Sequence, residues 1–226
     1  MHRDRELSDD VLDDPTLAPS LVDAVVFDLG NVLIRWDPFR AIAAGVGEER
    51  ARAFLNHASF DFAAWNHAQD AGRSWVDGEE AAIASHPDLA DEIRAYRANF
   101  SASLVGPVDD TVAVLRDLHR AEVPLFALTN WSEELFPEAV ARFDFLDLFH
   151  DIVVSGEEGV AKPDPEIFDV LEGRLRHLGG LEDSIFIDDS ETNVLAAERL
   201  GMDAIHFTGP GHLREDLRAR GLPLPA

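Results

Sequence analysis

The stretch VVFDLGNVL, residues 25–33, carries the first strong structural signal in the chain. It continues an apolar, valine-rich run that begins at residue 21, and Asp28 follows that run directly, ahead of a Gly-Asn pair. A short run that is almost entirely apolar is typical of a strand covered on both faces of a sheet. We therefore predict a buried strand over residues 21–27, with a carboxylate at its carboxyl end.

Four more short apolar runs have the same character and predict further strands, at residues 124–128, 151–154, 184–187 and 203–207. Segments with apolar residues at helical spacing lie before or between them, at residues 108–121, 165–178 and 191–200. Strands that alternate with single helices form parallel sheets with right-handed crossovers. The predicted fold is therefore α/β, with a Rossmann-like parallel sheet as its core and helices on both faces.

The segment from residue 36 to residue 106 interrupts this alternation. It is far longer than the usual connection of about 4 to 6 residues, and its aromatic and aliphatic residues recur at helical spacing. We predict that residues 36–106 form an inserted α-helical cap over the mouth of the sheet. Residues 21–35 and 107–226 then form the Rossmann-like catalytic core, and residues 1–20 a mobile, acidic N-terminal leader.

The composition excludes several classes of protein. The chain has 19 Lys and Arg residues against 44 Asp and Glu, a formal net charge of −25, and no stretch concentrates the cations. Binding to nucleic acid or to anionic membranes is therefore not expected. The chain has no cysteine, which excludes thiolate chemistry, and no run approaches the roughly 20 apolar residues of a membrane span. We predict a soluble, cytoplasmic protein; the sequence does not fix the oligomeric state, and a homodimer stays open.

Polar residues follow the predicted strands at points that a parallel sheet brings together. Ligands of such sheets bind outside the carboxyl ends of the strands. The residues at these ends, or in the loop that follows, are Asp28, Thr129, Asn130, Lys162, Asp188 and Asp189. Lys162 is the single lysine of the chain. One polar strand end is common, but three carboxylates, a hydroxyl and the only lysine at adjacent ends indicate a functional site.

The chemistry of this set points to phosphate. Carboxylates that converge without cysteine or histidine form an oxygen-rich site that suits Mg²⁺. Magnesium held by one or two carboxylates keeps positions for phosphate oxygens, and Lys162 supplies a compact positive charge for the same group. Thr129 and Asn130 can donate hydrogen bonds to it. Asp28, held on a rigid strand end, can attack phosphorus and form an aspartyl-phosphate.

The strings VVFDLGNVL, ALTN, GVAKPDPEIF and IFIDDSETNVLAAERLGM resemble, in order and spacing, the four motifs of haloacid dehalogenase-type hydrolases with a helical cap inserted after the first motif. The resemblance covers residues 21 to 207. It implies Asp28 as the nucleophile and Thr129 as the phosphoryl-binding hydroxyl. Lys162 would steady both the nucleophile and the phosphoryl group.

The same resemblance implies a Mg²⁺ site made by Asp28 and Asp189 with the assistance of Asp188. Asn193, one helical turn beyond Asp189, would orient Lys162 or the metal shell. The expected substrate is a small phosphorylated metabolite. Its pocket walls would include two tryptophans that lie close to the motifs, Trp36 and Trp131.

One position departs from the family pattern. Phosphatases of this group usually carry a second aspartate, a general acid and base, two residues after the nucleophile, where this chain has Gly30. The backbone carbonyl of Gly30 can still bind the metal. The positioned proton donor, typically worth about 10² to 10⁴ in rate, is lost. Asn31 and the cap residues His57 and His67 are candidates for a substitute.

Two other functions remain open at this point. A 2-haloacid dehalogenase uses the same aspartate without a metal, which suits Gly30, but it gains nothing from the adjacent Asp188 and Asp189, whose charges repel. A binding or regulatory protein could have kept the fold and lost turnover, although the other reactive positions are intact. We favour a Mg²⁺-dependent hydrolase of small phosphomonoesters.

Overall fold

A central parallel sheet organises the computed structural model, which describes residues 24–225. Its five strands lie in the order β5-β4-β1-β6-β7, and each neighbouring pair is parallel. The strands are β1 (Ala24–Phe27), β4 (Leu125–Thr129), β5 (Asp151–Val154), β6 (Ser184–Asp188) and β7 (Asp203–His206). The predicted α/β sheet is confirmed, with β1 at its centre. The leader predicted for residues 1–20 lies outside the described residues.

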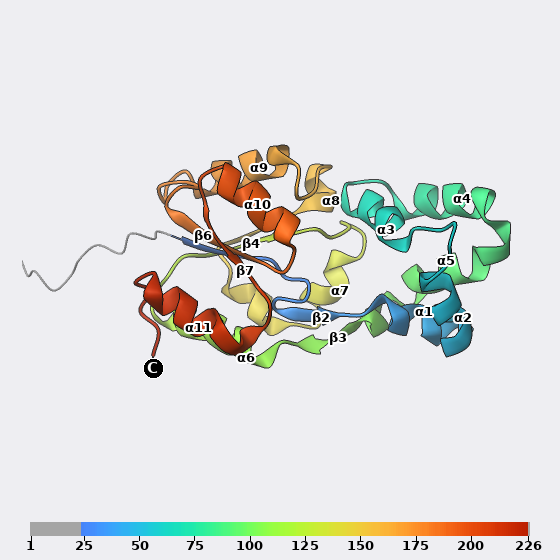
Figure 1. The fold of residues 1–226 in the computed structure, drawn as a ribbon, viewed down its shortest axis with the longest axis horizontal. Coiled ribbons are helices and arrows are strands. Elements are labelled where there is room, and N and C mark those ends of the chain that lie inside the picture. The colour runs from blue at the N-terminus through green and yellow to red at the C-terminus, as the bar shows by residue number, and fades with distance from the viewer. Residues whose placement is uncertain (1–23, 226) are drawn as a thin grey trace, which may run out of the picture.

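Helices cover both faces of this sheet (Figure 1). The longer ones are α6 (Asp109–Arg120), α9 (Pro165–Leu175), α10 (Glu191–Arg199) and α11 (Pro210–Ala219). Figure 1 shows α9 and α10 on one face of the sheet and α6 and α11 on the other. Shorter helical segments follow β4 and β5: α7 (Phe136–Val140), η3 (Asp144–Leu148) and α8 (Ser155–Glu158).

Alternate residues of β1 face the two sides of the sheet, which is why the whole strand is apolar. Val25 and Phe27 belong to the cluster that includes residues of α6 and α11, whereas Ala24 and Val26 belong to the cluster that includes residues of α9 and α10. All four are fully buried. Burial on both faces explains the continuous apolar run and fixes the point at which Asp28 leaves the sheet.

Five helices and two 3₁₀ turns lie between β1 and the rest of the core. They are α1 (Pro38–Val46), α2 (Glu48–Leu55), α3 (Phe62–Asp70), α4 (Trp75–Ser85), η1 (Pro87–Leu89), α5 (Ala90–Ala98) and η2 (Phe100–Ser103). Side chains of Asp37, Asp61 and Ser74 cap α1, α3 and α4 by accepting hydrogen bonds from backbone N–H groups of their first turns. We call residues 37–103 the helical insert, which Figure 1 shows beside one end of the sheet.

The two connections between the core and the helical insert pair with each other. They form an antiparallel two-stranded sheet of β2 (Ile34–Trp36) and β3 (Leu104–Pro107). The backbone N–H of Asp37 donates to the carbonyl of Ser103 at 2.9 Å, so the pairing continues to the base of the insert. Neither strand is predicted from the sequence, because runs this short show no alternation. The boundaries of a cap over residues 36–106 stay a prediction.

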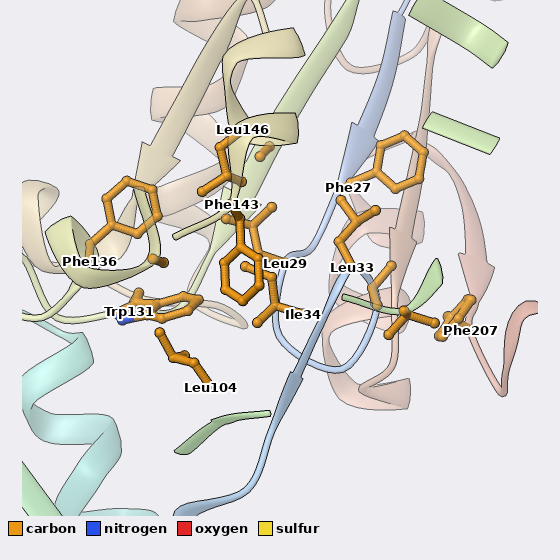
Figure 2. Close-up of a cluster of buried hydrophobic side chains, with 14 of the residues drawn as sticks. Phe27, Leu29, Leu33, Ile34, Leu104, Trp131, Phe136, Phe143, Leu146 and Phe207 are labelled. Atoms are coloured by element: carbon orange, nitrogen blue, oxygen red, sulfur yellow. The ribbon is translucent and has the colours of Figure 1, made fainter. Parts of the chain in front are cut away.

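The core and the insert share one apolar cluster. Figure 2 shows Trp131, just beyond β4, lying between Phe136 of α7 and Leu104 of β3. The rings of Trp131 and Phe136 are 5.7 Å apart at their centroids, and the ring of Phe100 in the insert is 6.0 Å from Trp131. Among residues 24–225, no helix is both long enough and apolar enough to cross a membrane.

Candidate active site

Three carboxylates meet at the carboxyl ends of β1 and β6. Asp28 directly follows β1, Asp188 ends β6, and Asp189 is the next residue. Each offers one oxygen, and these oxygens all lie within 4.8 Å of one another. Asp188 is fully buried, and only 7% of Asp28 is exposed. The parallel pairing of β1 with β6 brings these groups together, as the sequence predicted.

Lys162 lies between two of these carboxylates. Its Nζ is 2.9 Å from Oδ1 of Asp28 and 2.7 Å from Oδ2 of Asp188, and it donates to the carbonyl of Leu128 at 2.7 Å. The side chain is 1% exposed. All three donor positions of the ammonium are therefore used, and the lysine connects the ends of β1, β4 and β6.

Asn130 and Asn193 hold this arrangement in place. The side chain of Asn130 donates to the backbone carbonyl of Lys162 and accepts from its N–H, both at 2.8 Å. Nδ2 of Asn193 lies 3.0 and 3.1 Å from the two oxygens of Asp188, and the N–H of Ser190 donates to the same carboxylate. Asn193 therefore contacts Asp188 directly and orients Lys162 through it.

Burial and the repulsion between like charges make the ionised form of Asp28 and Asp189 less favourable. Burial raises the pKa of Asp28 to about 7; Lys162 opposes this, and Asp188 and Asp189 add to it. Burial also raises the pKa of Asp189, with Asp188 as the next cause. Burial alone would lower the pKa of Lys162, but Asp28 and Asp188 overcome it and raise that pKa. One ammonium does not balance three carboxylates, so the cluster suits a further hard cation such as Mg²⁺.

A cavity of about 210 Å³ opens on this cluster. Its candidate catalytic side is formed by Asp28, Gly30, Asn31, Asn130, Lys162, Asp189 and Asn193. Its other side is formed by Trp36, Asn66, Asp70, Trp75, Tyr96, Phe100, Trp131, Ser132 and Leu135. The two tryptophans predicted as pocket walls therefore both lie at the cavity.

Two of the predicted site residues do not line the cavity. Asp188 lies behind Asp28 and Asp189, where Lys162 and Asn193 occupy its oxygens. Thr129, the last residue of β4, is 1% exposed, and its neighbour Asn130 lines the cavity instead. Thr129 therefore lies at the predicted strand end, but it is buried and does not reach the cavity surface.

The proposed substitutes for the missing general acid fall into two groups. Neither His57 nor His67 lines the cavity; the ring of His57 packs against that of His86, 6.4 Å away within the insert. Asn31 does line it, with a left-handed φ of 54°, and its Oδ1 accepts from the N–H of Trp36 at 3.1 Å. Its side chain also hydrogen-bonds Asp189 and favours the ionised carboxylate. Asn31 therefore links the first strand end to Asp189 and the start of the insert.

The comparisons with known proteins fit this geometry. The family model of the haloacid dehalogenase-like hydrolases matches residues 22–201. The chain belongs to this family. Among curated relatives, a sesquiterpene phosphatase of Aspergillus oryzae is 25% identical over 185 residues, which are 82% of this chain and 89% of that protein.

Solved structures of haloacid dehalogenase family proteins share the fold. A family enzyme of Bacteroides thetaiotaomicron in complex with magnesium has a TM-score of 0.64 at 23% identity, over 87% of this chain and 98% of its own. An L-2-haloacid dehalogenase of Xanthobacter autotrophicus with chloropropionic acid covalently bound has a TM-score of 0.53 at 20% identity, over 81% of this chain and 76% of its own. At these identities the likeness shows the fold alone.

In this haloacid dehalogenase-like hydrolase, the insert brings polar residues to the cavity that were not predicted from the sequence. Asn66 and Asp70 lie on α3, four positions apart and hence on one face of the helix. Tyr96 of α5 accepts a hydrogen bond from Nε1 of Trp36 at 3.3 Å. The sequence does show Asn66 and Asp70 at helical spacing beside the apolar residues of α3. This spacing does not show whether that face of α3 lies toward the cavity or toward solvent.

Proposed function

We propose that this protein is a Mg²⁺-dependent hydrolase of small phosphate monoesters that uses Asp28 as its nucleophile. The observation that carries the proposal is the position of Lys162, whose ammonium lies within 3 Å of both Asp28 and Asp188 beside the cavity. Its three N–H groups hold the two carboxylates and the carbonyl of Leu128 in place, and its positive charge favours the approach of a phosphate to Asp28. A relative named as a phosphatase supports the same reaction class.

The reaction has two steps. An oxygen of Asp28 bonds to phosphorus while the bond from phosphorus to the ester oxygen breaks, and the alcohol leaves as its anion, which takes a proton from water. Water then attacks phosphorus, the bond to Asp28 breaks, and inorganic phosphate leaves, which restores the carboxylate. Lys162 holds Asp28 through both steps, and Asn193 holds Asp188 against Lys162. Asn130 fixes the loop that carries the lysine.

The donor set fits Mg²⁺. Oxygens of Asp28, Asp188 and Asp189 lie within 4.8 Å of one another, and carboxylates are ligands that Mg²⁺ prefers. Asp28, Asp189 and the backbone carbonyl of Gly30 would hold the ion, with Asp188 supporting them from behind. Bound Mg²⁺ supplies positive charge for the phosphoryl oxygens.

The helical insert serves as the cap of this site. Trp36, Asp70, Tyr96 and Phe100 come from it or from its connection to the core, and they close the cavity opposite Asp28. A closed cavity keeps bulk water from the reacting groups and selects the alcohol part of the ester. Thr129 and Asn130 support the phosphate side of the site.

A side chain can begin at Gly30 without a clash at its Cβ. A Cβ at Gly30 would have a single neighbour within 4 Å, Oδ2 of Asp28 at 3.9 Å. The φ of Gly30 lies outside the left-handed region, so a residue with a side chain can adopt this backbone conformation. Without a proton donor at this place, the enzyme suits esters whose alcohol leaves easily, or esters that bring a proton from elsewhere.

Two alternatives follow from the same fold. A metal-free 2-haloacid dehalogenase would have to work with a nucleophile whose pKa is raised by burial and further by Asp188 and Asp189, which weakens it near neutral pH. A regulatory protein that only binds a phosphorylated ligand would keep the cavity and lose turnover. The dehalogenase would release halide and the regulatory protein would release no product, whereas a phosphatase releases inorganic phosphate.

The experiment that tests the proposal measures phosphate and chloride release by the purified protein. We expect phosphate release from p-nitrophenyl phosphate to stop in EDTA and to return when Mg²⁺ is added in excess. Asp189→Asn should need a higher Mg²⁺ concentration for the same rate, because one ligand is lost. Phosphate release that persists in EDTA would disprove the metal requirement, and chloride release from 2-chloropropionate in EDTA would favour the dehalogenase.

A further inference from the structure

A carboxylate that the proposed reaction does not use lies in the wall of the cavity. Asp70 is the last residue of α3, and it is 9% exposed. Among the described residues, no Lys, Arg or His nitrogen lies within 4.0 Å of it. A buried carboxylate without a cationic partner costs free energy, and a donor that comes from outside the chain would lower that cost.

The contacts of Asp70 fix its position and leave acceptor sites free. One oxygen, Oδ2, accepts from Nδ2 of Asn66 at 2.8 Å, and the backbone N–H of Ser132 favours its ionised form. The backbone carbonyl of Asp70 accepts from Oγ of Ser155 at 2.5 Å, which ties the end of α3 to the core. A carboxylate has about four acceptor sites, so the side chain can accept further hydrogen bonds. Burial raises the pKa of Asp70 to about 7, as expected where no cation compensates the charge.

The cavity around Asp70 is aromatic. Its non-catalytic side carries five aromatic side chains and one leucine: Trp36, Trp75, Tyr96, Phe100, Trp131 and Leu135. Two of the indole N–H groups are already used, that of Trp36 by Tyr96 and that of Trp75 by Ser132 at 2.7 Å. Asn66 is engaged with Asp70 and Ser132 with Trp75, whereas the indole N–H of Trp131 has no partner among the described residues. The few polar groups that remain on this side cannot satisfy the several hydroxyls of a sugar phosphate.

The size of the cavity limits the substrate. A cavity of about 150 Å³ holds one benzene molecule, and this cavity of about 210 Å³ must also hold the phosphate near Asp28 and Lys162. The part of the alcohol that this cavity encloses is therefore close to a single ring in size. In the phosphate ester of such an alcohol, the apolar part would contact the aromatic side of the cavity, and the phosphate would contact Asp28 and Lys162.

From this arrangement we infer that Asp70 is a specificity-determining residue, which selects phosphate monoesters of small apolar alcohols that carry a hydroxyl or ammonium donor remote from the phosphate. The donor would bond to the free acceptor sites of Asp70, while the apolar frame contacts the aromatic side of the cavity. This inference rests on the proposed phosphatase function and names the substrate class of the same site.

The test uses three phosphate esters of equal shape. They are 4-ethylphenyl, 4-(hydroxymethyl)phenyl and 4-(aminomethyl)phenyl phosphate, and only the last two carry a donor at the remote end. A hydrogen bond to a charged group corresponds to about 10- to 100-fold. We expect kcat/KM of the wild-type protein to be higher by that factor for the better of the two donor esters than for the ethyl ester. Which donor ester is better tells whether a hydroxyl or an ammonium is preferred.

Two variants separate recognition from structural support. Asp70→Leu should bring the ratio between donor and ethyl esters close to one. Asp70→Asn should remove the preference for the ammonium and keep part of that for the hydroxyl, because an amide oxygen still accepts. If Asp70 had only a structural role, replacing it would lower kcat/KM for all three esters by the same factor. Asp91→Asn, the same change at an exposed residue of the insert that pairs with Arg50, is the matched control and should leave the ratios unchanged.

Further outcomes are decisive. A wild-type ratio near one, or a ratio that neither variant changes, would overturn the role of Asp70. A protein that releases phosphate from none of the esters, nor from p-nitrophenyl phosphate, would overturn the proposed phosphatase function. In that case calorimetric titration of the three esters into the protein with Mg²⁺ still tests the inference. Affinity that depends on the donor and is lost in Asp70→Leu supports it, and equal affinity for all three esters contradicts it.

Discussion

Replacing Asp28 with asparagine is expected to abolish phosphate release. The amide keeps the shape of the side chain but cannot form the bond to phosphorus, and loss of a nucleophile of this kind costs on the order of 10⁴-fold or more in kcat. The fold should persist, because Lys162 keeps Asp188 as its partner. Turnover of p-nitrophenyl phosphate, measured on protein with an unchanged circular dichroism spectrum, checks the prediction.

The stability of the same variant gives an independent check. The pKa of Asp28 is raised in the folded protein, so the ionised carboxylate is less favourable there than in the unfolded chain. The neutral amide removes that cost, and we expect Tm to stay the same or to rise. Asp91→Asn serves as the control at an exposed site and should keep full activity. If Asp28→Asn kept a substantial part of the wild-type rate, Asp28 would not be the nucleophile.

The second large effect is expected for Lys162→Arg, a change that keeps the charge. The ammonium is buried and meets three oxygens at 2.7 to 2.9 Å, and a planar guanidinium is larger and cannot point at all three. We expect kcat/KM for p-nitrophenyl phosphate to fall by about 10²- to 10³-fold, the usual cost of losing a donor to a developing charge. Steady-state kinetics measure it.

Two further variants, one without a charge at position 162 and one with an exchange of Arg for Lys elsewhere, serve as comparisons for Lys162→Arg. Lys162→Met leaves Asp28 and Asp188 buried without a cation, which costs about 3 to 5 kcal/mol of folding free energy, and chemical denaturation should show it. Arg218→Lys, an exchange at an exposed position of α11, should change neither activity nor stability. Full activity in Lys162→Arg would mean that any buried positive charge suffices.

The sheet and the catalytic cluster could be predicted from the sequence because local patterns specify them. The apolar run before Asp28 is buried on both faces, so it carries a clear strand signal. Once the strands are parallel, the carboxyl ends of β1 and β6 meet, and the meeting of Asp28 with Asp189 follows. Lys162 lies in the loop beyond β5, and Asn130 holds that loop beside them.

The insert side of the cavity could not be predicted in the same way. Whether α3 presents Asn66 and Asp70 to the cavity depends on how the insert packs on the core, through contacts such as that of Ser155 with Asp70. These contacts join residues far apart in the sequence and leave no periodic signal. The short pairing of β2 with β3 is missed for the same reason.

The most direct test of the central claim, phosphoryl transfer to Asp28, is rapid-mixing kinetics with p-nitrophenyl phosphate. p-Nitrophenolate leaves without a proton, whereas the second step lacks the base that Gly30 replaces, so the aspartyl-phosphate should accumulate. We predict a burst of about one p-nitrophenol per active site before the steady state, with no burst of inorganic phosphate.

The matched variant is Gly30→Asp, whose Cβ meets no clash. It should shrink the burst and raise kcat/KM for alkyl phosphates more than for p-nitrophenyl phosphate, because only poor leaving groups need the proton. A burst that depends on Asp28 and shrinks in Gly30→Asp is the result that the account predicts. Equal, linear release of p-nitrophenol and phosphate from the first turnover, unchanged in Gly30→Asp, would contradict it.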